Sequence, residues 1–135
     1  MHQFFFFMFF FLFIRMNGYA TEVKQQNIPY FQYKYQDILI DEKVVRKGPL
    51  ECEKRYKAIQ PILNLFKRPI TVLDLGAAEG YFSFKIAKDY ESICVMVEDG
   101  YVEMLGNTGT ALQKLCEIND YSNVILLKKK SMFQI

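Results

Sequence analysis

The stretch TVLDLGAAEGYF, Thr71–Phe82, decides the fold of this 135-residue chain. Its first half is a short apolar run with one acid, which is typical of a strand buried in a parallel sheet. Two glycines, Gly76 and Gly80, follow directly. Glycine permits the tight, left-handed turns that join a strand to a helix. The stretch therefore predicts a strand, a glycine turn and the start of a helix.

The segments after this stretch repeat the alternation of strand and helix. We expect a helix over Gly80–Tyr90, a strand over Glu91–Glu98, a helix over about Thr110–Ile118 and a strand over Val124–Leu127. Strands joined by helix-length crossovers form right-handed βαβ units around a parallel sheet. The sequence predicts an α/β fold with a three-layer parallel sheet over residues 70–135, in which the strands are buried on both faces.

The part before the sheet is expected to be an N-terminal extension over residues 21–69. Residues 28–47 mix aromatic residues with loose alternation, which predicts short extended segments and at most a hairpin. Residues 50–67 carry apolar residues at helical spacing and predict a helix. Pro61 lies inside that helix, so we expect a kink or two abutting helices there.

The first 20 residues form a Phe-rich leader that we leave out of the expected fold. Its apolar core, Phe4–Ile14, is shorter than the roughly 20 residues of a membrane-spanning helix, so stable membrane anchoring is not expected. The core has the length of a signal-peptide core, and Gly18–Ala20 forms a small-x-small cleavage site. Alternatively, translation begins at Met16. The first interpretation predicts an exported protein, and the second predicts a cytoplasmic one.

Composition excludes several kinds of function. With 17 basic and 15 acidic residues the net charge is +2, which gives no indication of nucleic-acid binding. The three cysteines form no CxxC pair, and the single histidine is His2. We therefore expect no metal site, no disulfide framework and no histidine-based catalysis in the folded part.

The glycine turn is the expected ligand site, because ligands of open parallel sheets bind at the carboxyl ends of the strands. Gly76 and Gly80 allow close approach to bare backbone, and the N–H groups that open the next helix are expected to face the same crevice. Asp74 at the strand end would repel a phosphate. It favours a ligand that carries an amino or other cationic group beside its anionic one.

A pair of acids lies at the end of the next strand. Glu98 lies 22 residues after Gly76 and is followed by Asp99. An acid at this distance is placed to accept hydrogen bonds from both hydroxyls of a ribose. Glu98 is the better candidate, because the strand alternation continues up to it and Asp99 begins the turn.

These residues resemble the class I S-adenosylmethionine-dependent methyltransferases. Their first motif, hhDhGxxxG with h apolar, here reads VLDLGAAEG, and Glu98 matches the acid that closes their second strand. The resemblance covers about Thr71–Leu127 and implies a Rossmann-like fold with S-adenosylmethionine as cofactor. It also implies that Tyr101 or Val102 packs on the adenine. The cofactor-binding residues that it implies are Asp74, Gly76, Ala77, Ala78, Glu79, Gly80, Glu98 and Asp99.

The resemblance stops after about three strands of a sheet that has about seven in the family. We therefore expect a truncated or frameshifted form of the enzyme, whose open edge beside the first strand could pair with another chain. No catalytic residue and no methyl acceptor can be assigned. Lys43, Arg46, Arg55 and Tyr56 either touch the substrate or cofactor carboxylate, or form a solvated face and a packing tyrosine.

Two other functions are weighed against a methyltransferase. A nicotinamide dinucleotide site needs glycine at positions 76, 78 and 81, but the chain has Ala78 and Tyr81 there. The other alternative is a non-catalytic exported or membrane-surface protein that uses the βαβ core only as a scaffold.

Overall fold

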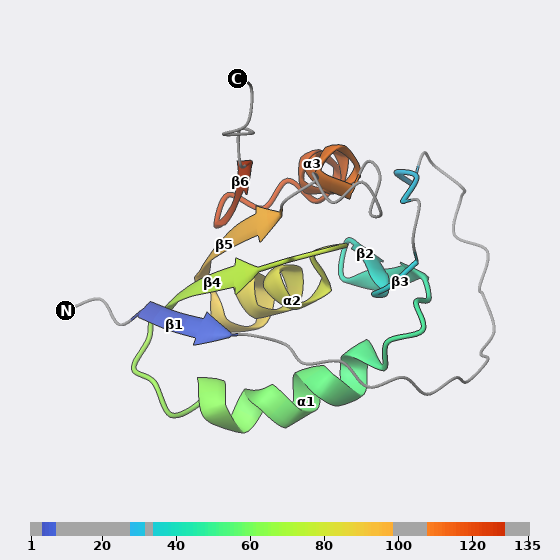
Figure 1. Cartoon of the computed structure of the whole chain (residues 1–135). Helices are drawn as coiled ribbons and strands as arrows, with labels where there is room; N and C mark the ends of the chain where they lie inside the picture. The colour runs from blue at the N-terminus through green and yellow to red at the C-terminus, as the bar shows by residue number, and fades with distance from the viewer. Residues whose placement is uncertain (1–3, 8–27, 32–33, 99–107, 129–135) are drawn as a thin grey trace, which may run out of the picture.

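The computed structural model describes residues 4–7, 28–31, 34–98 and 108–128. Its centre is a four-stranded parallel sheet in the order β1-β4-β5-β6 (Figure 1). The strands are β1 (Phe4–Phe7), β4 (Thr71–Leu75), β5 (Ile93–Glu98) and β6 (Val124–Lys128). The crossover helices are α2 (Tyr81–Tyr90) and α3 (Thr108–Asn119). The expected α/β fold with its strand–helix–strand–helix–strand order is confirmed.

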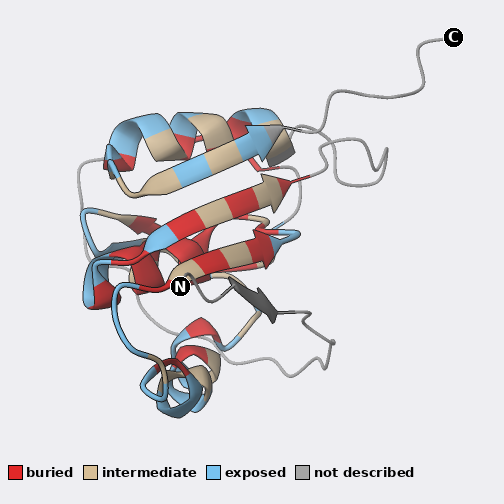
Figure 2. Ribbon diagram, turned by 90° about the vertical axis from the view of Figure 1, so that its left-hand side faces the viewer, coloured by how far each residue is buried: buried red, intermediate tan, exposed pale blue. Residues whose placement is uncertain are grey.

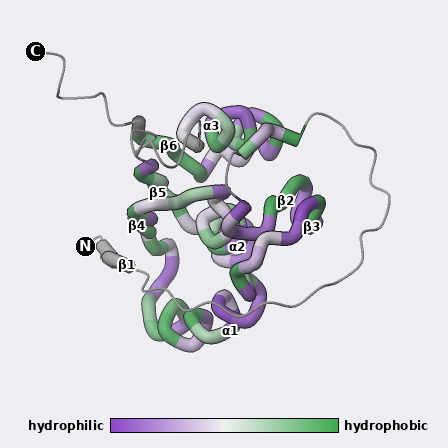
Figure 3. Tube along the Cα trace, turned by 45° about the vertical axis from the view of Figure 1, so that its right-hand side comes forward, coloured by the Kyte–Doolittle hydropathy of each residue, from purple (hydrophilic) through white to green (hydrophobic). Residues whose placement is uncertain are grey.

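Both crossover helices lie on one face of the sheet (Figure 3). Helix α2 packs on β5 and α3 packs on β6. Two right-handed crossovers that advance in the same direction across a sheet place both helices on the same side. The helices of the described residues therefore cover one face of the sheet only.

The opposite face is aliphatic and partly exposed, as the alternating colours of β4, β5 and β6 show (Figure 2). Its side chains Leu75, Ile93, Ile125 and Leu127 are 40–51% exposed. The expectation of a three-layer sheet with strands buried on both faces is therefore wrong for the part of the chain that the structure describes. The apolar runs resemble doubly buried strands in sequence, but their burial alternates residue by residue.

Strand β1 comes from the Phe-rich leader. It pairs in parallel with β4, from Phe4 opposite Thr71 to Phe7 opposite Asp74. From the sequence, this leader is expected to lie outside the fold and to leave the edge of β4 open. In the structure, the leader supplies the strand that lies along that edge.

A chain that begins at Met16 is expected to be less stable and to self-associate, because it lacks β1 and leaves the backbone of β4 unpaired. Hydrogen exchange at Thr71–Asp74 should become faster by about tenfold or more than in the full chain. Sedimentation should show concentration-dependent association. Equal protection of β4 in both chains would contradict the pairing with β1.

The N-terminal extension forms a hairpin and a helix. Strands β2 (Ile38–Ile40) and β3 (Lys43–Arg46) pair antiparallel, as the sequence suggests. Helix α1 (Cys52–Leu63) is shorter at both ends than the expected range of 50–67. It is a single α-helix with Pro61 in its last turn, so the expectation of two abutting helices is wrong. Pro61 has no N–H to donate to the carbonyl of Lys57, one turn earlier.

The extension shares one core with the sheet. Strand β2 packs against α2 and α3, and α1 packs against α2. Phe31, Ile38 and Leu39 join the same buried cluster as Met96 and Leu112. This packing places residues 34–50 beside the turn that follows β4. Among the helices that the structure describes, none has the length and apolarity needed to cross a bilayer.

Candidate functional site

The turn after β4 lies across the end of β5. The Gly76 N–H donates to the Val97 carbonyl at 2.8 Å, which draws the turn over the neighbouring strand. Three of its residues have positive φ: Gly76 at +75°, Ala78 at +52° and Gly80 at +74°. Positive φ is easy for glycine and strained for alanine. The turn therefore has a tightly wound backbone at the carboxyl edge of the sheet.

The two glycines of the turn have different surroundings. A Cβ added to Gly76 would meet no described atom within 4 Å, so the backbone is open there. A Cβ added to Gly80 would lie 2.8 Å from Phe84 Cε2 and 3.0 Å from Leu112 Cδ1. Gly76 leaves room for a ligand, whereas Gly80 lets α2 pack closely against α3 and β5.

Asp74 lies between β4 and α2, with 7% of its surface exposed. Its Oδ2 accepts a hydrogen bond from Ser83 Oγ at 2.7 Å. None of the ion pairs among the described residues includes Asp74. Burial raises the pKa of this carboxyl above its ordinary value, and the Ser83 bond opposes that rise only in part. Asp74 is thus a buried acid without a cationic partner in the described structure.

Glu98 folds back onto the glycine turn. Its Oε2 accepts a hydrogen bond from the Ala78 N–H at 2.8 Å, and the side chain is largely buried. This bond joins the end of β5 to the turn after β4.

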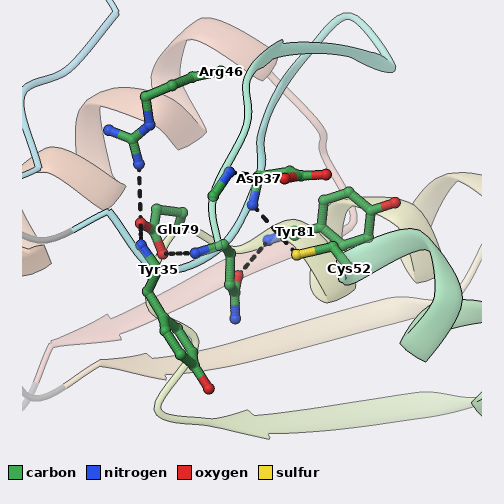
Figure 4. Close-up of polar contacts among 8 residues, drawn as sticks. Tyr35, Asp37, Arg46, Cys52, Glu79 and Tyr81 are labelled. Carbon is green, nitrogen blue, oxygen red and sulfur yellow. Dashed lines mark hydrogen bonds and ion pairs between the residues drawn. The ribbon is translucent and has the colours of Figure 1, made fainter. Parts of the chain in front are cut away.

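Glu79 faces the N-terminal extension (Figure 4). From the sequence, Glu79 is expected in the loop around the cofactor. Its backbone is in that loop, but its side chain is 1% exposed. The carboxylate accepts bonds from the Tyr35 N–H, the Gln36 N–H and Arg46 Nη2. We therefore do not count the Glu79 side chain among the ligand-facing groups.

The start of α2 is partly capped by the chain itself. The Tyr81 N–H donates to Gln36 Oε1 at 3.0 Å, and the Gly80 N–H donates to the Ala77 carbonyl at 2.8 Å. The expectation that the first N–H groups of this helix face the crevice unpaired is wrong for these two. The Gly80 N–H is satisfied within the turn, and the Tyr81 N–H is satisfied by the extension, whose position beside α2 no local sequence pattern indicates.

The remaining expected residues divide into four groups. Lys43 on β3 is exposed, and Arg55 on α1 is half-buried. Ala77 is fully buried beneath the turn. Tyr56 is a packing tyrosine whose hydroxyl donates to Asp89 Oδ2 at 2.7 Å, and Arg46 pairs with Glu79. Asp99, Tyr101 and Val102 lie outside the described residues.

Sequence reasoning missed Gln36 and Ser83. Ser83 had a signal, because it is a small polar residue on the otherwise apolar inner face of α2, one turn past the glycine turn. Gln36 had none, since its role depends on a contact between residues 45 positions apart.

No family model matches the chain. No curated protein matches it either. The function is therefore argued from the geometry and charge of the site.

Proposed function

We propose that this chain binds S-adenosylmethionine and is a methyltransferase-like protein, with its cofactor at the carboxyl ends of β4 and β5. The observation that carries the proposal is Asp74, a buried carboxyl without a cationic partner beside the bare backbone of Gly76. A buried charge is costly unless a partner compensates it. Buried acids with a perturbed pKa are concentrated at functional sites.

The chemistry of the ligand follows from that acid. A free phosphate or a dinucleotide pyrophosphate brings more negative charge to Asp74 and is disfavoured. The amino acid part of S-adenosylmethionine carries an ammonium group and lies next to a sulfonium, so it supplies the missing positive charge. The open backbone of Gly76 gives that group room to approach.

Glu98 supports a ribose in the same ligand. Its carboxylate is fixed at the end of β5 by the Ala78 N–H, and a fixed carboxylate is a strong acceptor for vicinal hydroxyls. With Asp74 for the ammonium group and Glu98 for the ribose, the two strand ends match the two polar ends of one nucleoside-linked amino acid. Methyl transfer on such a site relies on proximity and in-line orientation of the acceptor.

The test is calorimetric binding of S-adenosylhomocysteine to the full chain and to Glu98→Gln. The variant is expected to bind about tenfold to 100-fold more weakly, because hydrogen bonds to a charged acceptor contribute about 1.5–3 kcal/mol. Glu117→Gln is the matched control, since Glu117 is exposed on α3 and its Oε1 accepts a hydrogen bond from Gln113 Nε2. It should bind like the unchanged chain.

Three results would contradict the proposal. Absence of binding by a folded chain would favour the scaffold function. Binding that is insensitive to Glu98→Gln would place the ligand elsewhere. Equal or tighter binding of a nicotinamide dinucleotide would favour the other cofactor class.

A further inference from the structure

The buried carboxylate of Glu79 joins the turn after β4 to the N-terminal extension. We call this turn, residues 76–80, the ligand loop. Its Oε1 accepts bonds from the Tyr35 N–H at 2.8 Å and from Arg46 Nη2 at 3.0 Å, and its Oε2 accepts a bond from the Gln36 N–H at 3.0 Å (Figure 4). Arg46 also balances its charge. These donors come from two separate parts of the extension, the segment before β2 and the end of β3.

Gln36 makes a second link to the same loop. Its backbone N–H donates to Glu79, while its side-chain Oε1 accepts from the Tyr81 N–H at 3.0 Å. One residue of the extension therefore holds both sides of Gly80. Gly80, which has positive φ, lies between these anchor points, and Ala78, for which positive φ is strained, lies just before them. Strained backbone persists where surrounding contacts fix it.

The turn at Gly48 holds the same segment of the extension in place. A Cβ added to Gly48 would lie 2.4 Å from the Gln36 carbonyl oxygen, so the turn at Gly48 packs directly on this segment. The Leu50 N–H donates to the Tyr35 carbonyl at 3.1 Å, and the Gly48 N–H donates to Asp37 Oδ1 at 2.9 Å. Residues 35–37 are thus held between the turn at Gly48 and the ligand loop.

We propose that Glu79 is a positioning residue for the ligand loop. It holds Tyr35, Gln36 and Arg46 against the turn after β4, a set of contacts that we call the clamp. The extension and the loop therefore become ordered together, as one unit. The consequence for a ligand rests on the proposed function. The clamp holds Gly76 and Ala78, which carry the open backbone and the Glu98 contact, in their binding conformation. The extension is then part of the ligand site although no side chain of it is assigned to touch the ligand.

The test compares the full chain with Glu79→Gln by hydrogen exchange and by S-adenosylhomocysteine calorimetry. A glutamine has one acceptor oxygen in place of two, and its NH₂ group faces an N–H donor. Amide exchange at residues 35–37 and 76–81 should rise together, by about tenfold or more, while exchange in β5 stays unchanged. The affinity for S-adenosylhomocysteine should fall by about tenfold.

Two further variants keep the test informative. Glu42→Gln is the matched control, because Glu42 joins the same hairpin to α2 through an exposed ion pair with Lys88 at 2.9 Å. It should leave loop exchange and affinity unchanged. If Glu79→Gln does not fold, Gln36→Met removes only the acceptor for the Tyr81 N–H and should loosen both segments in the same way.

The outcomes separate this inference from the proposed function. Unchanged loop exchange in Glu79→Gln overturns the clamp. Faster loop exchange with unchanged affinity overturns the positioning role. If the unchanged chain binds no S-adenosylhomocysteine but both segments loosen together in the variant, the clamp stands and the proposed ligand is wrong.

Discussion

Gly80→Ala is expected to lower the free energy of unfolding by about 3 kcal/mol, whereas Gly76→Ala lowers it by only about 1 kcal/mol. Both positions have φ near +75°, so the backbone strain of an alanine is similar at each. At Gly80 the new methyl group would also lie 2.8–3.2 Å from Phe84, Leu112 and Met96. These side chains are buried, and in a close-packed core they have little space to move away from the added methyl group.

The substitutions Gly76→Ala and Gly80→Ala also distinguish an effect on stability from an effect on ligand binding. At Gly76 the added methyl group occupies the open space where the ligand approaches, so Gly76→Ala should weaken S-adenosylhomocysteine binding much more than it weakens folding. Urea unfolding and calorimetry on the two variants provide the measurement. Equal losses of stability at both positions would contradict the packing described for Gly80. Unchanged binding in Gly76→Ala would contradict the ligand site.

Asp74→Asn is expected to weaken S-adenosylhomocysteine binding by about 30-fold or more, because loss of a buried charge pair costs about 2 kcal/mol or more. The variant should nevertheless fold as well as the unchanged chain at neutral pH. Asparagine keeps an oxygen acceptor for Ser83 Oγ and removes a buried charge. Asp120→Asn, at an exposed position before β6, is the matched control for binding.

The pH dependence of the same variant tests the state of Asp74. Burial raises the pKa of the Asp74 carboxyl in the folded chain above its ordinary value of 3.8. The unfolded chain therefore releases this proton at lower pH than the folded chain, and the stability of the ligand-free protein falls as pH rises through that interval. Asp74→Asn has no carboxyl at this position, so it does not lose stability in this way as the pH rises. Its stability relative to the unchanged chain should increase as the pH rises above about 4, where the unfolded carboxyl loses its proton.

Thermal unfolding of both chains across that pH range, followed by circular dichroism, measures this difference. A constant difference between the two chains would mean that Asp74 has an ordinary pKa in the folded state. A difference of the opposite sign would mean that an uncounted cation pairs with Asp74. Either result would remove the reason for assigning a cationic ligand group to this site.

The part of the fold that is local in sequence was predictable. Alternating strands and helices after Thr71 follow from apolar runs and helical spacing, and the glycine turn follows from residue type alone. The contact between Glu98 and Ala78 was also accessible, because parallel βαβ units bring consecutive strand ends together. Each of these features depends on at most two consecutive strands.

The parts that could not be predicted depend on distant contacts. Glu79 belongs to a motif that suggests a ligand loop, but its partners are 33 to 44 residues away, so its side-chain direction has no local signal. The leader pairs with a strand more than 60 residues downstream. Burial of the strands on one face likewise depends on where the crossovers place the helices, which the composition of a strand does not encode.

The aliphatic face of the sheet has a practical consequence for the use of fluorescent dyes on this protein. Dyes such as ANS bind accessible apolar surface, which is usually taken as a sign of partial unfolding. With Leu75, Ile93, Ile125 and Leu127 accessible in the folded chain, such a dye should fluoresce strongly before any unfolding begins. A dye-based melt would start from a high baseline and conceal the transition. Dye fluorescence of this protein should therefore be read as a property of its native surface.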